Sequence, residues 1–322
     1  MNKSTAILIL SYALFALATP LTKWLALNKL DLTADGRELI SFCNVLFIGN
    51  LCAALFALLY YQPLELLKHY LRIGRKAHWM MLLCGSLSAI VPSLLFISLE
   101  HTSIANIVLL SRTGPVLFAI IGTLVFRQRL TKWELIGFGF ILLSVLITAL
   151  FATGSALGIG EILVLSSGVF FAITAIVSKL TLPIVPSRVF LFCRNFYASI
   201  IFMLIALCLY GPGHFSDAFH PRLWAVMTLY SLVAILFAQA TWFYALERVK
   251  ATTVGSWSFL SPVLTILFGF SLLHEKPSGI QLLALSLTVA GILISNYRTL
   301  TGLCQRWLSQ APESSLGTNY DG

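Results

Sequence analysis

The sequence is poor in charged residues, and poorest in acidic ones. Of 322 residues only 10% are charged, with 12 acidic residues against 21 basic ones. An ordinary soluble domain has about 25% charged residues, which cover its surface. The chain therefore cannot be an ordinary soluble globule, and its 58% hydrophobic content predicts that lipid is its main solvent.

Motifs for catalysis and for cofactor binding are also missing. The sequence has no Gly-rich phosphate loop ending in Lys-Ser/Thr, no Gly-x-Ser-x-Gly, and no His/Asp/Glu cluster at metal-ligand spacing. Its six cysteines form no Cys-x-x-Cys pair and lie mainly in apolar runs, which favours small core residues over disulfides or metal ligands. We therefore expect no enzyme activity, no cofactor and no metal site.

The surplus of basic residues does not indicate a nucleic-acid partner. The Lys and Arg residues are dispersed between apolar runs and form no aromatic-interleaved patch that could follow a phosphate backbone. The expected partners are the lipid bilayer and a small-molecule substrate, and the oligomeric state is left open.

Long apolar runs predict the fold class. Because every backbone N–H and C=O must be satisfied within a bilayer, runs of about 20 apolar residues predict spanning helices. The sequence thus predicts an all-α membrane protein with ten transmembrane helices. The expected spans are near 6–27, 38–60, 79–98, 104–126, 132–151, 158–180, 189–210, 223–246, 251–273 and 278–296.

The distribution of basic residues predicts the orientation. With a cytoplasmic N-terminus, only Lys29, Arg37, Arg222 and Lys276 fall in outside loops, and the remaining loop cations fall inside. The first apolar run is too long for a signal-peptide core, so it is read as a retained span. We expect a multi-pass protein of the bacterial inner membrane with both termini in the cytoplasm, ending in a polar cytoplasmic tail at 298–322.

An internal repeat divides the chain into two halves. The stretch from Leu99 to Thr148 recurs from Leu246 to Ser295 without a gap, so that Ser111 matches Ser258 and Pro115 matches Pro262. The predicted repeats are 1–151 and 152–297. Five spans per repeat is an odd number, so the second repeat enters the membrane from the opposite side. Inverted repeats of this kind are typical of secondary transporters.

These features resemble the drug/metabolite transporter superfamily, in particular its EamA-type branch. The resemblance is carried by two five-span halves, a Pro in the middle of each fourth span, Leu-Glu after each third span, and the turn His274-Glu275-Lys276-Pro277 before the last span. The first half departs from the pattern, because Gln128 stands where the family has Glu. The resemblance implies a ten-helix bundle that moves small metabolites. It also implies a central cavity lined by the first, third, fourth, sixth, eighth and ninth spans.

Arg112 is the first candidate for substrate binding. It is expected near the middle of the fourth span, where a buried Arg costs about 2.5–3.5 kcal/mol on insertion scales. Its guanidinium could face an aqueous cavity and bind an anionic group with two hydrogen bonds. Alternatively it could be neutralised by Glu100 or bond to carbonyl groups that Pro115 leaves free.

Pro115 and Pro262 are candidate hinges. Each removes the helical hydrogen bond to the carbonyl of Ser111 or Ser258, respectively, and should kink its span. The serines and the freed carbonyls would then form polar spots for substrate near the middle of the membrane. The small residues on the same faces could instead serve close helix packing.

The remaining candidates are aromatic, amide and charged residues. Trp257, Gln239 and Tyr12 are expected at substrate-contacting positions, although Trp257 could equally be a core or lipid-facing residue. Lys23, Lys179 and Arg194 lie near span ends. These cations could form gating ion pairs with Glu100 and Glu247, or their side chains could simply reach the headgroups.

The function expected from the sequence is secondary transport, driven by a gradient rather than by ATP. The protein would export or exchange a small metabolite such as an amino acid. The alternatives are an exchanger of phosphorylated or nucleotide-linked sugars, in which several cations should converge, and a flippase for lipid-linked substrates or a membrane enzyme.

Overall fold

The structure is a computed structural model that describes residues 3–27, 42–98, 101–102, 107, 110–111, 113–153, 158–211, 220–258, 260–273, 279–297 and 301. Its elements within these ranges are helices. In the first half they are α1 (Lys3–Leu27), α2 (Phe42–Tyr60), α3 (Pro63–Arg72), α4 (Arg75–Ser98), α6 (Thr113–Val125) and α7 (Lys132–Thr153). In the second half they are α8 (Ile159–Thr181), α9 (Ser187–Tyr210), α10 (Pro221–Tyr230), η2 (Ser231–Phe237), α11 (Ala238–Arg248), α12 (Ala251–Ser258), α13 (Leu260–Leu273) and α14 (Gly279–Ser295).

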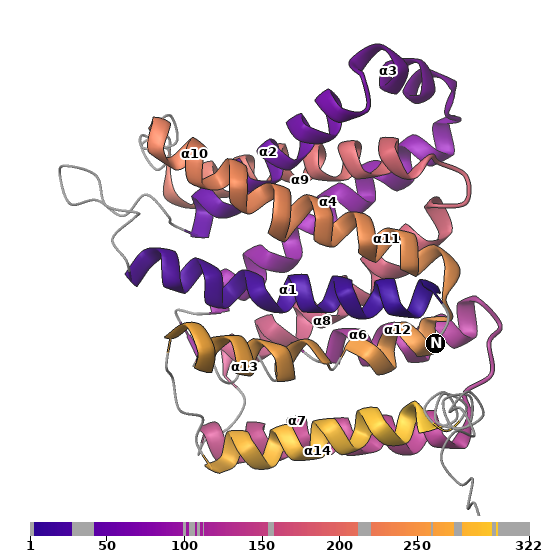
Figure 1. The fold of residues 1–322 in the computed structure, drawn as a ribbon, viewed down its shortest axis with the longest axis vertical. Coiled ribbons are helices and arrows are strands. Elements are labelled where there is room, and N and C mark those ends of the chain that lie inside the picture. Colours follow the sequence, from indigo (N-terminus) through magenta and orange to yellow (C-terminus); the bar gives the residue numbers. More distant parts are fainter. Residues whose placement is uncertain are drawn as a thin grey trace, which may run out of the picture.

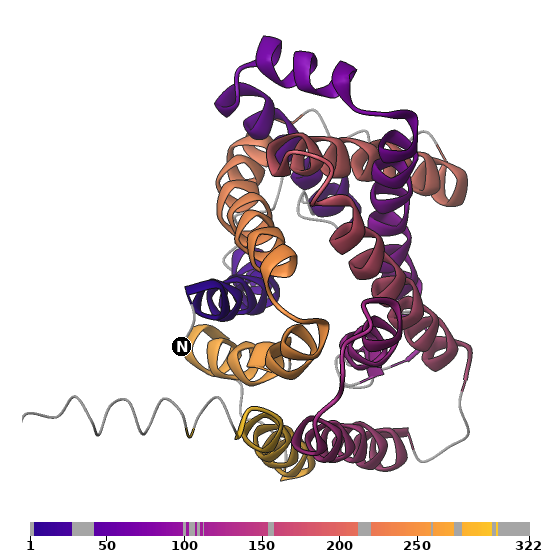
Figure 2. The same ribbon diagram turned by 90° about the vertical axis from the view of Figure 1, so that its right-hand side faces the viewer.

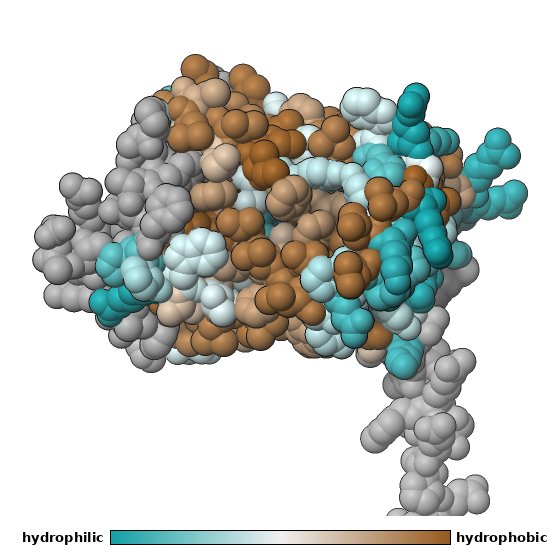
Figure 3. Space-filling model, turned by 90° about the horizontal axis from the view of Figure 1, so that it is seen from above, coloured by the Kyte–Doolittle hydropathy of each residue, from teal (hydrophilic) through white to brown (hydrophobic). Residues whose placement is uncertain are grey.

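The all-helical fold class is confirmed for the described residues, and each predicted apolar run contains a helix. Within the part of the chain that the structure describes, four helices are long and apolar enough to cross a membrane, or five if the bent pair of α2 and α3 counts as one span. Figure 3 shows an apolar belt across the middle of the molecule and hydrophilic residues gathered toward its right-hand end. The structure is therefore that of a multi-pass membrane protein, while the count of ten spans stays a prediction.

Two local features were not predicted. The first is α3, which leaves α2 at an angle of 98° and projects from the body of the protein (Figure 1). It begins with Pro63, whose fixed φ and missing N–H suit the first turn of a helix. The second is η2, a π-helical segment between α10 and α11. The Ser231 hydroxyl at its start donates to the Met227 carbonyl, and π-helical turns often occur at functional sites.

The helix contacts are consistent with a two-fold relation between the halves. Contacts of α1 with α11 and α13 match contacts of α8 with α4 and α6. Contacts of α4 with α9 match those of α10 and η2 with α2. The pairs α2–α9 and α7–α14 each join equivalent helices of the two halves, and the pair α6–α12 joins the equivalent fourth and ninth predicted spans. The α7–α14 pair lies side by side at one edge of the molecule in both views (Figures 1 and 2).

The α7–α14 pair shows how the halves are related. A Cβ atom added to Gly137 would lie 2.5 Å from Ser295, one added to Gly291 would lie 2.7 Å from Ile141, and the Ser144 hydroxyl lies 3.1 Å from that of Thr288. As the residue number rises along α7 it falls along α14, so these equivalent helices are antiparallel. A two-fold axis that relates antiparallel helices is perpendicular to them, which is the arrangement that an inverted repeat requires.

Candidate functional site

A cavity lies between the two halves. It consists of two adjoining pockets of about 420 and 330 Å³, which share Phe171, Arg194, Gln239 and Trp242 among their lining residues. The walls come from α1, α2, α4, α8, α9, η2 and α11, with Ser111, Pro115, Ser258 and Ser261 closing the second pocket. The lining predicted from the family resemblance is thus extended, because α2 and α9 also contribute.

Arg194 is the only charged side chain among the described residues that line either pocket. It lies seven residues into α9, about 10 Å along the helix from Ser187. Its guanidinium carbon lies 5.3 Å from the centre of the Phe243 ring. Its Nε atom is buried and has no hydrogen-bond partner among the described residues. No acidic side chain among the described residues pairs with Arg194, so it brings a positive charge to the cavity wall that only the Phe243 ring contacts there.

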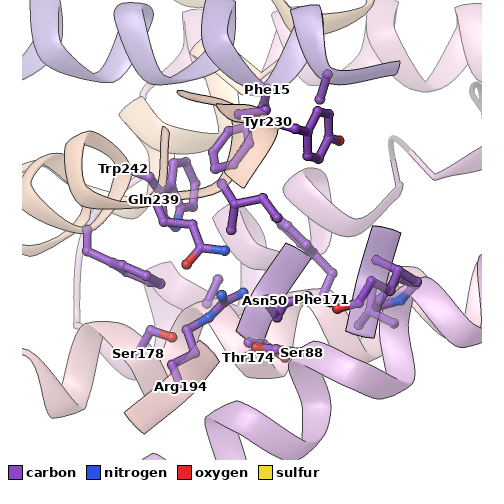
Figure 4. Close-up of a pocket in the computed structure, with 18 residues that line it drawn as sticks. Phe15, Asn50, Ser88, Phe171, Thr174, Ser178, Arg194, Tyr230, Gln239 and Trp242 are labelled. Atoms are coloured by element: carbon purple, nitrogen blue, oxygen red, sulfur yellow. Dashed lines mark hydrogen bonds between the residues drawn. The ribbon is translucent and has the colours of Figure 1, made fainter. Parts of the chain in front are cut away.

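Close packing of α4 against α9 holds Arg194 in place. A Cβ atom added to Gly85 of α4 would lie 2.4 Å from the Cβ of Tyr197 and 3.3 Å from the Arg194 carbonyl oxygen. Only a glycine lets the two helices approach so closely at this level. The backbone of Arg194 is thereby pinned against α4, and its side chain extends toward Gln239 (Figure 4).

Gln239 is oriented by its neighbour on α9. The Asn195 Nδ2 atom donates to the Leu191 carbonyl at 2.8 Å and to the Gln239 Oε1 atom at 2.8 Å. The Leu191 carbonyl requires the nitrogen of Asn195 on its side, so the amide of Asn195 cannot be reversed without losing this bond. Gln239 must then direct its oxygen to Asn195, which leaves its amide N–H groups for the cavity (Figure 4).

The hydroxyl groups of the lining have the opposite character. Those of Ser88, Ser167, Thr174 and Ser258 each donate to a carbonyl of their own helix, at 2.5 to 2.7 Å. Their hydrogens are used, so their oxygens can act only as acceptors toward a ligand. The cavity thus combines donors at Arg194 and Gln239 with acceptors elsewhere on its wall.

Most of the sequence-predicted binding residues that the structure describes come together here. Tyr12, Ser111, Ser258, Gln239 and the hinge candidate Pro115 all line the second pocket. The Tyr12 hydroxyl donates to the Val254 carbonyl at 2.8 Å, and its ring lies edge-on to Trp242 at 5.4 Å. Whether these residues bind substrate stays a prediction.

Pro115 does not leave a free carbonyl. It stands third in α6, where its missing N–H costs no helical hydrogen bond. The Ser111 carbonyl accepts instead from the Gly114 N–H at 3.2 Å, one residue earlier in the helix. Pro262 likewise stands third in α13. The predicted polar spot at Ser111 therefore has no unpaired carbonyl, because the turn tightens to use it.

Three predicted residues that the structure describes lie outside the cavity lining: Trp257, Lys179 and Glu247. Trp257 packs against the main apolar core, with its indole Nε1 buried and without a partner among the described residues. The Lys179 Nζ atom donates to the carbonyls of Leu246 and Val249 at the end of α11. Glu247 pairs instead with Arg248 at 2.7 Å. Backbone carbonyls thus satisfy the Lys179 ammonium group in this structure, and a gating pair of Lys179 with Glu247 stays a prediction.

Several predictions lie outside the described residues. These are Arg112, Glu100, the turn at 274–277, and the side chains of Lys23 and Pro262. Gln128, which departs from the family pattern, is described: its Oε1 atom accepts from the Ala251 N–H at the start of α12, at 3.0 Å. A neutral amide supplies the acceptor that a carboxylate would supply there.

Sequence reasoning missed the central role of Arg194. Its position near the predicted start of a span favoured a side chain that reaches the headgroups, and only the packing of α9 against α4 and α11 directs it inward. The signal that could have found it is the polar pair Arg194-Asn195 within an otherwise apolar run.

The fold and the cavity together define a multi-pass helical membrane protein with a solute-sized site between two related halves. The model of the EamA-like transporter family matches this chain twice, over residues 3–150 and 158–297. The chain belongs to the EamA-like transporter family, and it is therefore a transporter rather than an enzyme.

The chain also resembles individual proteins. It is 30% identical over 297 residues to the uncharacterized transporter sll1164 of Synechocystis sp., covering 89% of this chain and 85% of that protein. It is 26% identical over 203 residues to an uncharacterized transporter of Archaeoglobus fulgidus, covering 62% of this chain and 69% of that protein. A solved crystal structure shares the fold with a TM-score of 0.68 at 17% identity, covering 92% of this chain and 98% of that one.

Proposed function

We propose that this protein is a secondary transporter that exports or exchanges a small metabolite, such as an amino acid, across the bacterial inner membrane. In this proposal the repeats 1–151 and 152–297 supply ten spans, and both termini and the tail 298–322 face the cytoplasm. The observation that carries the proposal is the cavity between the two halves, which has donor groups at one place and acceptor groups at another. Such a lining suits a solute with both an anionic and a donor group.

Alternating access follows from the two-fold relation. Each half contributes helices to the cavity wall, and halves related in this inverted way can open one cavity to opposite sides of the membrane in turn. The α7–α14 pair lies at the edge of the molecule (Figure 2), and none of its described side chains lines either pocket. We propose that this pair stays together as a support while the remaining helices rock around the solute.

The test is solute counterflow in proteoliposomes that contain the purified protein and no ATP. Vesicles are loaded in turn with each of the common amino acids, and uptake of the same radiolabelled amino acid is measured. We expect uptake above that of protein-free vesicles for at least one solute. Absence of counterflow for the whole panel, with protein that is monodisperse and inserted, would contradict the proposal.

A matched pair of variants shows whether transport passes through the cavity. Ala234 lines the first pocket, whereas Ala225 lies exposed on α10. We expect Ala234→Trp to block counterflow by filling the pocket and Ala225→Trp to leave it unchanged. Equal counterflow in both variants would place the transport path elsewhere.

A further inference from the structure

The charge of the cavity restricts the solute it can hold. Arg194 contributes one positive charge, and no Asp, Glu, Lys or His is present among the described lining residues. A buried charge is costly unless it is paired. A solute with a single negative charge would neutralise the cavity, whereas a phosphate dianion would leave a net negative charge within the membrane.

The donors at this place are arranged for a planar anion. Arg194 offers a rigid fork of N–H groups, which matches a carboxylate with two parallel hydrogen bonds. Beside it, the Asn195–Gln239 bond of 2.8 Å leaves the Gln239 amide N–H groups for the cavity. Figure 4 shows Gln239 facing the Arg194 guanidinium, so both sets of donors converge on one position.

Aromatic rings form a large part of the remaining wall, between the hydroxyl groups that can accept hydrogen bonds. Phe15, Phe171, Trp242 and Phe243 line both pockets around the two donor residues. Aromatic rings at such positions bury the apolar body of a ligand and favour edge-on or stacked contacts with another ring. A hydrophilic solute such as a sugar would leave its hydroxyl groups unpaired against these rings.

We propose that Arg194 and Gln239 form a carboxylate-binding site and that the transported solute is a small monocarboxylate with an apolar body. This proposal rests on the proposed transport function. The Arg194 guanidinium binds the carboxylate and Gln239 donates to the same group, while Asn195 acts as a positioning residue that holds the Gln239 amide. An amino acid and a simple carboxylic acid share the carboxylate, whereas only the simple acid carries the net negative charge that neutralises the cavity. They differ in the ammonium group, whose N–H groups can donate hydrogen bonds to the hydroxyl oxygens of Ser167 and Ser258.

The experiment uses two series of probes built on a phenyl and an isobutyl body. The phenyl series is L-phenylalanine, 3-phenylpropanoate, 2-phenylethylamine and 2-phenylethyl phosphate, and the isobutyl series has the same four headgroups. Binding to the purified protein is measured by isothermal titration calorimetry, and transport by counterflow. The variants are Arg194→Gln, Arg194→Lys and Gln239→Met. The matched control is Arg248→Gln, which changes an exposed arginine outside the cavity.

We expect both carboxylate probes to bind, and the amine and phosphate probes to bind much more weakly. Arg194→Gln should weaken carboxylate binding by about 10- to 150-fold, the range for one charged hydrogen-bond partner. Arg194→Lys should recover part of this loss, because it restores the charge without the fork. Gln239→Met should weaken binding by a smaller factor, and Arg248→Gln should have no effect. Preference for L-phenylalanine over 3-phenylpropanoate would identify the solute as an amino acid, and the reverse preference as a simple acid.

The proposal and the transport function fail in different ways. Two results would overturn the carboxylate site and leave the transport function in place. One is counterflow that is as fast in Arg194→Gln as in the wild-type protein. The other is wild-type counterflow that favours the amine or phosphate probe. Absence of any transport by folded wild-type protein would overturn both. If Arg194→Gln does not fold, as judged by size-exclusion chromatography, the Arg194→Lys and Gln239→Met variants decide, and unchanged affinity in both would refute the site.

Discussion

The packing of α7 against α14 makes a sharp prediction, because α7 carries two glycines in contrasting places. An added Cβ on Gly137 would lie 2.5 Å from the Ser295 Cβ and 2.6 Å from the Gly291 carbonyl oxygen, whereas one on Gly139 would have no neighbour within 4 Å. Both substitutions to Ala gain the same intrinsic helix propensity, about 1 kcal/mol. Any difference between the two variants therefore measures the helix contact.

The size of the difference follows from the distances. Ordinary contacts begin near 3.4 Å, so Gly137→Ala must move α14 away by about 0.8–0.9 Å, because backbone atoms of α14 cannot rotate aside. The bond between the Ser144 and Thr288 hydroxyls, now 3.1 Å, lies in the same contact and would lengthen with it. Overpacking of this kind costs about 1–3 kcal/mol. We expect Gly137→Ala to be destabilised by about that amount relative to Gly139→Ala.

The assay is thermal unfolding of both variants in the same detergent, followed by intrinsic fluorescence and by the fraction that stays monodisperse on heating. Gly137→Ala should unfold at a lower temperature than the wild type, and Gly139→Ala at the same or a slightly higher one. A midpoint of Gly137→Ala at or above that of Gly139→Ala would show that the helices are not packed at this distance, and the antiparallel α7–α14 pairing would then be refuted.

Three further substitutions test single contacts. Tyr12→Phe removes the donor to the Val254 carbonyl and should cost about 1 kcal/mol of stability. The control Tyr60→Phe, at a position 79% exposed, should cost nothing measurable. Equal unfolding midpoints of the two variants would argue against the Tyr12–Val254 hydrogen bond. Lys179→Met leaves the Leu246 and Val249 carbonyls without their donor. It should lower the free energy of unfolding by about 1–3 kcal/mol, while transport per folded molecule is retained. Lost transport at unchanged stability would instead support a gating role for Lys179. Gln128→Leu removes the acceptor of the Ala251 N–H and should destabilise the protein by about 1 kcal/mol. Gln128→Glu should not destabilise it, because a negative charge is favourable at a helix N-terminus. Equal losses of stability in both variants would contradict this account.

Much of the cavity could be predicted from the internal repeat. Ser111, Pro115 and Ser258 were selected because they recur at one offset, and all three line the second pocket. Gln239 was selected as a polar residue within an apolar span, and it lines both pockets. A polar group at that depth must face other protein groups or a cavity rather than lipid.

Charges near helix ends are harder to place from the sequence. Sequence position cannot tell whether a long side chain there reaches the headgroups, a carbonyl or a cavity, since all three lie within reach of its flexible stem. Lys179 binds the carbonyls that end α11, and these become neighbours only when α8 packs against α11. Arg194 faces the cavity only because Gly85 brings α4 against α9.

The sequence by itself determined that this is a helical membrane protein built from two related halves, because composition, apolar run length and a repeat in register depend only on the order of residues. It also determined the family, which the two matching repeats confirm. Only the tertiary structure decided which polar groups share one space. The charge that faces the cavity, the orientation of the Gln239 amide and the capping role of Lys179 all arise from contacts between helices far apart in the chain, and no local pattern encodes these contacts.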